Sequence, residues 1–257
     1  MQPVVVKRSA ALGDILLVEP LLRQLISNGE QTYLLTNRKY AELLSPTPRL
    51  SEVLLCRTSV PYRSRLIDLD NSYEQELVEY ITEAYFHKAG MKPQVDLQPQ
   101  LYIDCSSGFE DRKYAVLDIG YPGCRQFYKK GWQQVIDALR EKGLEVFLIG
   151  DRYWGHYAGV VDLRRGLKKQ SVSELAAVIR DCNYFIGIDS GPLHIARAYG
   201  KPGLGLYCAY ANVSLREFAG NRIVSYVCEC RKGEQGLHLK CLKGLPLGFI
   251  EKEVSLL

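Results

Sequence analysis

The first candidate for chemistry is a carboxylate that follows a tight turn. The stretch from Ser9 to Asp14 (SAALGD) lies between a short apolar run and a helical pattern, and Gly13 permits close approach of a ligand. Asp14 then falls at the start of a helix. It can act as a general base that takes a proton from a hydroxyl group, or it can be a helix-start carboxylate that the helix dipole stabilises. Neither a P-loop nor a dinucleotide-binding fingerprint is present at this turn.

A second candidate is an anion site where a strand meets a helix. Residues 187–194 (GIDSGPLH) contain the end of a predicted strand, a turn at Ser190 and Gly191, and a proline in the first turn of a predicted helix that includes His194. Free backbone N–H groups at such a helix start bind phosphate or diphosphate. Asp189 and the Ser190 hydroxyl lie beside them. The alternative is an ordinary capped turn, with Ser190 as the N-cap and His194 packed in the core.

Two further segments carry cations or thiols. The loop Cys124–Trp132 (CRQFYKKGW) holds three cations, and Lys130 among them could bind a diphosphate. The alternative is a solvated loop. Cys228, Cys230 and Cys241 could bind a metal, but zinc ligands are more often separated by two to four residues. We therefore expect reduced structural thiols and no metal site.

Composition limits the class of protein. The chain has 257 residues, of which 47% are hydrophobic and 24% charged, with a net charge of +4. These values exclude a disordered, collagen-like or coiled-coil chain, and the charge is too small for a nucleic-acid-binding stripe. The longest apolar stretch, from Ala10 to Leu22, is broken by Asp14 and Glu19, so we expect no transmembrane helix. The N-terminus has no signal-peptide pattern, which predicts a cytoplasmic protein.

Short apolar strands alternate with helical patterns along the chain, which predicts an α/β fold with parallel sheets covered by helices. The predicted strands are 4–6, 32–36, 53–57, 66–69, 114–119, 145–149, 184–188 and 203–207, and the predicted helices are 15–25, 74–89, 132–139, 175–182 and 192–199. Residues 92–100 (KPQVDLQPQ) hold two prolines and no helical period. We therefore expect two Rossmann-like lobes, 1–100 and 101–257, whose strand ends form a cleft for ligands.

Several of these segments resemble glycosyltransferase family 9, the ADP-heptose:lipopolysaccharide heptosyltransferase family. Residues Ala11–Leu25 (ALGDILLVEPLLRQL) are similar to the family pattern A-L-G-D-x-L-L-x-x-P-x-L-x-x-L, and Lys130–Trp132 matches its K-x-W. Residues Asp189–Pro202 (DSGPLHIARAYGKP) match D-[ST]-G-x-x-H-x-A-x-A-x-x-x-P. The segment that begins at Cys241 matches C-[LM]-x-x-[IL], which some members carry near their end. The resemblance extends from residue 4 to about residue 245.

The resemblance implies a GT-B fold, in which two Rossmann-like lobes with parallel sheets face each other across a cleft. It implies inverting, metal-independent transfer of a heptose-like sugar, without a cofactor, from a nucleotide diphosphate donor such as ADP-heptose. The donor would bind the C-terminal lobe, and a glycan or lipopolysaccharide-type acceptor would bind near the N-terminal lobe, which is short for the family. Asp14 would be the base. The donor site would be formed by Lys130, Asp189, Ser190, Gly191 and His194.

Two other functions remain open at this point. One is a non-catalytic nucleotide-sugar-binding or assembly protein with the same fold. The other is a different enzyme of that fold, such as a sugar-nucleotide epimerase. The expected partners are a nucleotide-sugar donor and a glycan or glycolipid acceptor, with no nucleic acid. The predicted location is the cytoplasm, and peripheral contact with the inner face of the membrane stays open.

Overall fold

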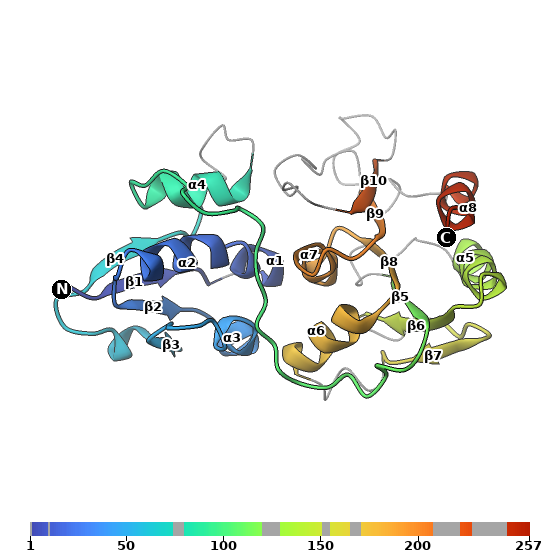
Figure 1. The fold of residues 1–257 in the computed structure, drawn as a ribbon, viewed down its shortest axis with the longest axis horizontal. Coiled ribbons are helices and arrows are strands. Elements are labelled where there is room, and N and C mark those ends of the chain that lie inside the picture. The colour runs from blue at the N-terminus through green and yellow to red at the C-terminus, as the bar shows by residue number, and fades with distance from the viewer. Residues whose placement is uncertain are drawn as a thin grey trace. The chain divides into compact units, whose positions relative to one another are not determined.

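The computed structural model describes residues 2–9, 11–73, 80–119, 129–150, 155–164, 171–207, 222–227 and 246–257, with the backbone alone at 129 and 130. The described residues up to Cys105 form one compact unit, called unit 1, and those from Ser106 onward form unit 2 (Figure 1). None of the described helices combines the length and apolar character that crossing a membrane requires.

Unit 1 contains a four-stranded parallel sheet in the order β3-β2-β1-β4 (Figure 1). Its strands are β1 (Val4–Lys7), β2 (Thr32–Leu35), β3 (Glu52–Leu54) and β4 (Arg65–Asp68). Its helices are α1 (Leu12–Leu16), α2 (Glu19–Ser27), α3 (Arg38–Leu44), the short 3-10 helix η1 (Arg57–Ser59) and α4 (Ile81–Lys88).

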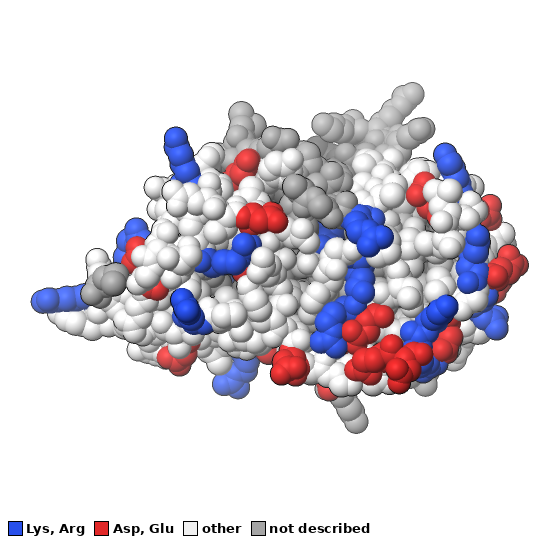
Figure 2. Space-filling model, viewed as in Figure 1, with Lys and Arg blue, Asp and Glu red and all other residues white. Residues whose placement is uncertain are grey.

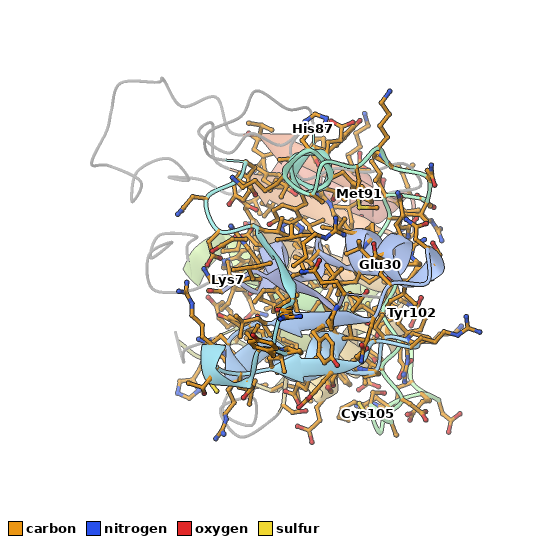
Figure 3. All side chains as sticks on the ribbon, turned by 90° about the vertical axis from the view of Figure 1, so that its left-hand side faces the viewer. Lys7, Glu30, His87, Met91, Tyr102 and Cys105 are labelled. Carbon is orange, nitrogen blue, oxygen red and sulfur yellow. The ribbon has the colours of Figure 1, made fainter. Side chains whose placement is uncertain are left out.

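The two faces of this sheet are covered differently. On the first face, Val4 and Val6 of β1 pack with apolar residues of α2 and α4 in the main core of the unit. The second face carries a small cluster from three strands and one loop, made of Val5, Leu35, Leu54, Tyr33 and Val60. No described α-helix contributes to that cluster. Figure 3 shows the two ends of these strands, with Lys7 at the end of β1 on one side of the unit and Glu30, just before β2, on the other.

The proline-containing segment 92–100 is held along α2 by hydrogen bonds. Arg23 donates to the backbone carbonyl of Asp96 at 2.8 Å, and Glu19 accepts from the backbone N–H of Gln100 at 2.9 Å. Glu19 is fully buried, and burial raises the pKa of its carboxyl group although Arg23 and Gln100 act against the shift. A segment without regular structure is therefore placed by the side chains of a helix.

Unit 2 contains a six-stranded parallel sheet in the order β10-β9-β8-β5-β6-β7 (Figure 1). Its strands are β5 (Tyr114–Asp118), β6 (Glu145–Ile149), β7 (Val160–Asp162), β8 (Tyr184–Ile188), β9 (Gly203–Tyr207) and β10 (Ile223–Val227). Its helices are α5 (Lys129–Glu141), α6 (Val172–Asp181), α7 (Gly191–Ala198) and α8 (Leu247–Ser255). Because Asp118 is paired with Gly187 in the register of β5 and β8, the ends of these two strands lie side by side.

The expected fold class, α/β with two parallel sheets, is confirmed, and every predicted strand is present. The predicted helix 15–25 is instead two helices, because Pro20 stands in the first turn of a new helix, α2. β3 ends at Leu54, earlier than predicted, and a 3-10 turn follows it. The predicted helix 74–89 is described only from Ile81. Besides this 3-10 helix, η1, the structure adds four elements that the sequence patterns did not indicate: α3, β7, β10 and α8.

Candidate functional site

Asp14 lies in α1, immediately after the turn that follows β1. Arg8, at the end of β1, donates a hydrogen bond of 2.7 Å to Oδ2 of Asp14 and another of 2.8 Å to the backbone carbonyl of Leu69. The Arg8 side chain is 3% exposed, whereas the Asp14 side chain is 16% exposed. The guanidinium is therefore buried, and the carboxylate keeps part of its surface exposed.

Two tyrosines complete the surroundings of this ion pair. The Tyr73 hydroxyl lies 3.4 Å from both carboxylate oxygens of Asp14, and the Tyr85 hydroxyl donates to the backbone carbonyl of Asp14 at 3.3 Å. The Arg8 guanidinium lies 5.3 Å and 5.7 Å from the centres of these two rings, within cation–π range. Burial by itself lowers the pKa of Arg8, but Tyr85 and Asp14 outweigh it, and the pKa ends above its usual value. The guanidinium therefore stays charged.

A second cluster of charges anchors the turn before Asp14. Asp70 accepts hydrogen bonds of 2.8 Å from both the backbone N–H and the hydroxyl of Ser9. Lys7 Nζ lies 2.7 Å from Asp68 and 2.8 Å from Asp70. These two aspartates form an Asp-x-Asp sequence, which the sequence analysis missed and whose oxygens could hold a divalent cation. In this structure the Lys7 ammonium ion itself contacts both carboxylates.

The strand–helix junction in unit 2 is formed where the sequence predicted it. β8 ends at Ile188 and α7 begins at Gly191, with Ser190 in the N-cap position. The Ser190 hydroxyl makes no cap bond to the helix backbone and instead donates to Oδ2 of Asp118 at 2.6 Å. Asp118 is 2% exposed. Sequence reasoning missed this carboxylate, although its place as the last residue of a buried strand next to the junction was the available signal.

The structure brings four of the six expected site residues together on this junction: Asp189, Ser190, Gly191 and His194. His194 is buried in α7, which agrees with the alternative of a packed histidine. Lys130 lies in the first turn of α5 in the same unit, and its side chain is outside the described part of the structure. Asp14 belongs to unit 1.

The candidate metal ligands cannot be placed, because Cys228, Cys230 and Cys241 lie outside the described residues. The loop residues 120–128 before α5 also lie outside them. Among the residues that the structure does describe, no group of three or more His, Cys, Asp or Glu side chains is arranged to hold a metal ion.

Comparison with known proteins decides the family. A sequence model described as glycosyltransferase family 9 (heptosyltransferase) matches residues 69–235, more than half of the chain. The chain belongs to glycosyltransferase family 9. A curated relative, lipopolysaccharide heptosyltransferase 3 of Escherichia coli, is 31% identical in an alignment 134 positions long that covers 47% of this chain and 38% of the relative. The chain thus aligns with less than half of that relative's length.

Solved structures of heptosyltransferases share the fold of this family 9 chain. The E. coli ADP-heptose LPS heptosyltransferase II has a TM-score of 0.74 at 16% identity, over 100% of this chain and 98% of that chain. The dodecameric iron-containing heptosyltransferase TibC, in complex with ADP-D-β-D-heptose, has a TM-score of 0.74 at 17% identity, over 99% of this chain and 75% of that chain. At these identities the likeness establishes the fold alone.

Proposed function

We propose that this family 9 chain transfers a heptose-like sugar from a nucleotide diphosphate donor to a glycan or lipopolysaccharide-type acceptor, with inversion and without a metal ion. The observation that carries the proposal is the Asp14 carboxylate, which a buried arginine holds at 2.7 Å while the aspartate side chain stays 16% exposed. The ADP-D-β-D-heptose bound in the TibC structure supports ADP-heptose as the donor to test first.

In this mechanism Asp14 is the general base. It removes the proton from an acceptor hydroxyl as that oxygen attacks the anomeric carbon, and the nucleoside diphosphate leaves from the opposite face. Arg8 has two opposing effects on this step. It fixes the direction of the carboxylate and keeps it ionised, and its positive charge also weakens the carboxylate as a base. Because Asp14 is more exposed than Arg8, a hydroxyl group can approach the oxygens from the solvent side.

The donor diphosphate would bind at the start of α7, where backbone N–H groups lack partners within the helix. A carboxylate at Asp118 would repel a bound diphosphate, so Asp118 is not expected to contact the donor directly. We therefore propose that Asp118 positions the Ser190 hydroxyl, from which it accepts a hydrogen bond of 2.6 Å. Lys130, in the first turn of α5, would supply the balancing positive charge.

The proposal that no metal takes part rests on Lys7. Its ammonium ion contacts both carboxylates of the Asp68–Leu69–Asp70 sequence, which are otherwise suited to a divalent cation. The iron-containing TibC makes a direct test necessary. Protein dialysed against a chelator should keep its turnover. A loss of turnover that Mg²⁺, Mn²⁺ or Fe²⁺ restores would contradict metal-independent transfer.

The test of the proposed function begins with a thermal-shift screen of ADP-, UDP-, GDP- and CDP-sugars and continues with the Asp14→Asn variant. Asn keeps the size and one acceptor oxygen, so we expect a loss of stability of about 1–3 kcal/mol from the weakened bond to Arg8. Because Asn cannot take the proton, turnover should fall about 100-fold or more while donor affinity stays nearly constant. Asp104→Asn, the same change at an exposed position of unit 1, is the matched control.

Two outcomes would reject parts of this proposal. Full activity of Asp14→Asn would place the base elsewhere. Wild-type protein that binds a nucleotide sugar but transfers it to no acceptor would instead favour the non-catalytic binding protein.

A further inference from the structure

One residue in the turn before Asp14 has an unfavourable backbone conformation. Ala11, the residue before α1, has φ 55° and ψ 135°. Residues other than glycine rarely have a positive φ, and the left-handed region that they do reach has ψ of about +30 to +60°. Ala11 lies outside that region, so its surroundings must offset the cost of this conformation. Backbone strain of this kind is concentrated at functional sites, and Ala11 precedes Asp14 by three residues.

Hydrogen bonds fix the chain on both sides of Ala11. On the helix side, the carbonyl of Ala11 accepts the N–H of Ile15 at 3.1 Å, and Ile15 is fully buried in the main core of unit 1. On the strand side, Ser9 donates its backbone N–H to Oδ1 of Asp70 and its hydroxyl to Oδ2, both at 2.8 Å. The side chain of Asp70 is therefore one of the two attachments of the strained turn.

Asp70 is held in turn by its own neighbours. It lies two residues beyond β4, where its N–H donates to Oδ1 of Asp68 at 3.1 Å and Lys7 Nζ lies 2.8 Å from its Oδ2. Figure 2 shows acidic and basic side chains interspersed over the surface turned to the viewer, so a charged contact by itself is ordinary for this chain. Asp70 differs because it also binds the backbone of the strained turn, 61 residues away along the chain.

We propose that Asp70 is a positioning residue for sugar transfer: through Ser9 it holds the strained turn at Ala11, from which the Asp14 carboxylate projects. This inference rests on the proposed role of Asp14 as the base. Without the bonds to Asp70, Ala11 is free to relax to a common backbone conformation, and the Asp14 side chain moves with the turn. A displacement of about 1 Å at a reacting group can lower a rate by about 100-fold.

Kinetics of transfer from ADP-heptose to a lipopolysaccharide-core acceptor test the proposal. Asp70→Asn should lower kcat by about 10-fold with little change in the KM for the donor, which we expect to bind unit 2. In Ala11→Gly/Asp70→Asn, kcat should return to within about 3-fold of wild type, because glycine adopts a positive φ at little cost and no longer needs the bonds to Asp70. Asp104→Asn, at an exposed position of unit 1, is the matched control.

A second comparison separates positioning from general support of the fold. In protein that already carries Asp14→Asn, adding Asp70→Asn should not lower the residual turnover further, because no base remains to be positioned. An aspartate that only stabilises the fold would lower turnover by the same factor in both backgrounds. Equal factors would therefore contradict the proposal.

The strain and the role of Asp70 can also be measured without an activity assay. Ala11→Gly should raise the urea midpoint of unfolding, whereas Ala158→Gly, at an exposed alanine of unit 2 whose φ is not positive, should lower it. Hydrogen exchange of the Ile15 N–H, which bonds to Ala11, should be faster in Asp70→Asn than in wild type. It should slow again in Ala11→Gly/Asp70→Asn.

Three further results would overturn the proposal: wild-type kcat in Asp70→Asn, no recovery in Ala11→Gly/Asp70→Asn, and a lowered midpoint in Ala11→Gly. If Asp70→Asn does not fold, Ser9 provides the comparison, because Ser9→Ala loses the hydroxyl and should lower kcat, whereas Ser9→Thr keeps it and should not. A wild-type protein without turnover would contradict the proposed function. The midpoint and exchange measurements would then still decide whether Asp70 holds the turn.

Discussion

The guanidinium of Arg8 binds Oδ2 of Asp14 through Nη2, and its Nη1 binds the backbone carbonyl that follows β4, that of Leu69. One buried side chain thus fixes the proposed base against the end of a neighbouring strand. The two bonds need two nitrogen donors at a fixed separation, which a guanidinium has and a lysine ammonium ion does not. Substitutions of Arg8 can therefore separate the effect of its positive charge on Asp14 from its effect on the direction of the Asp14 side chain.

Arg8→Lys and Arg8→Gln should both lower turnover, but they should differ in how turnover depends on pH. Both lose the fixed direction of Asp14, so kcat should fall by about 10- to 100-fold with little change in the KM for the donor. Arg8→Gln also removes the charge that favours an ionised carboxylate, so the acidic limb of the pH–rate profile should move to higher pH. In Arg8→Lys that limb should stay close to its wild-type position.

The pH–rate profile distinguishes this positioning role from a purely structural one. If Arg8 only supports the fold, both variants will lose active protein without a shift of the acidic limb. Arg38→Gln, which removes an exposed arginine of the same unit, is the matched control and should behave like wild type.

Asp70 should make stability depend on pH. Burial acts to raise the pKa of Asp70, but the hydrogen bonds from Lys7 and Ser9 outweigh it, and the pKa lies below its usual value. A carboxyl group with a lowered pKa stabilises the fold above its unfolded pKa, and that stabilisation is lost as pH falls. Asp70→Asn should therefore lower the free energy of unfolding by about 1–2 kcal/mol at pH 7, with a smaller difference from wild type near pH 3.

Urea denaturation at both pH values measures this difference. Asp104→Asn changes the same charge at an exposed position and should stay within about 0.5 kcal/mol of wild type. A difference for Asp70→Asn that is equal at pH 7 and pH 3 would contradict the proposed stabilisation by the ionised carboxylate.

The sequence predicted the strands and the positions of several candidate site residues at strand–helix junctions, because both depend on local signals. Each predicted strand is a short apolar run, and Asp14, Asp189 and Ser190 stand where a strand gives way to a helix. Their partners could not be predicted in the same way. Tyr73 lies 59 residues from Asp14 along the chain, and Asp118 lies 72 residues from Ser190. Only the packing of strands and helices brings such pairs together.

Ser190 shows where local reasoning stops. The sequence placed it correctly at the N-cap, where a serine hydroxyl usually accepts a backbone N–H. Asp118, at the end of the adjacent strand, offers a carboxylate that accepts a hydrogen bond of 2.6 Å from the Ser190 hydroxyl. A charged acceptor forms the stronger hydrogen bond. Knowing the direction of the Ser190 side chain therefore requires knowing that β5 and β8 are neighbours.

Lys130 can be tested against its own neighbour. If Lys130 binds the donor diphosphate, Lys130→Ala should weaken binding by about 1–3 kcal/mol, the range for charge-assisted contacts. Lys129→Ala removes the same charge one position earlier in α5, where the helix turns the side chain by about 100°. It should therefore have a smaller effect. Titration calorimetry measures both variants, and equal losses would show that only the overall charge of the first turn of α5 matters.

Gly187 should be necessary for the geometry of Asp118. A Cβ atom at Gly187 would lie 2.6 Å from Cε1 of the Phe185 ring and 3.1 Å from the Cβ of Asp118. Because Phe185 is buried, the clash must displace core atoms, and we expect Gly187→Ala to lower the free energy of unfolding by about 1–3 kcal/mol. Displacement of Asp118 should also disturb its bond to Ser190 and weaken donor binding.

Gly248→Ala is the matched control for this substitution. A Cβ atom at Gly248 has no atom within 4 Å, and the residue lies inside α8, so alanine should raise the free energy of unfolding by up to about 1 kcal/mol. Urea denaturation and titration calorimetry on both variants separate stability from binding. If Gly187→Ala is destabilised but binds the donor like wild type, the contact between Asp118 and Ser190 supports the fold and has no part in the donor site.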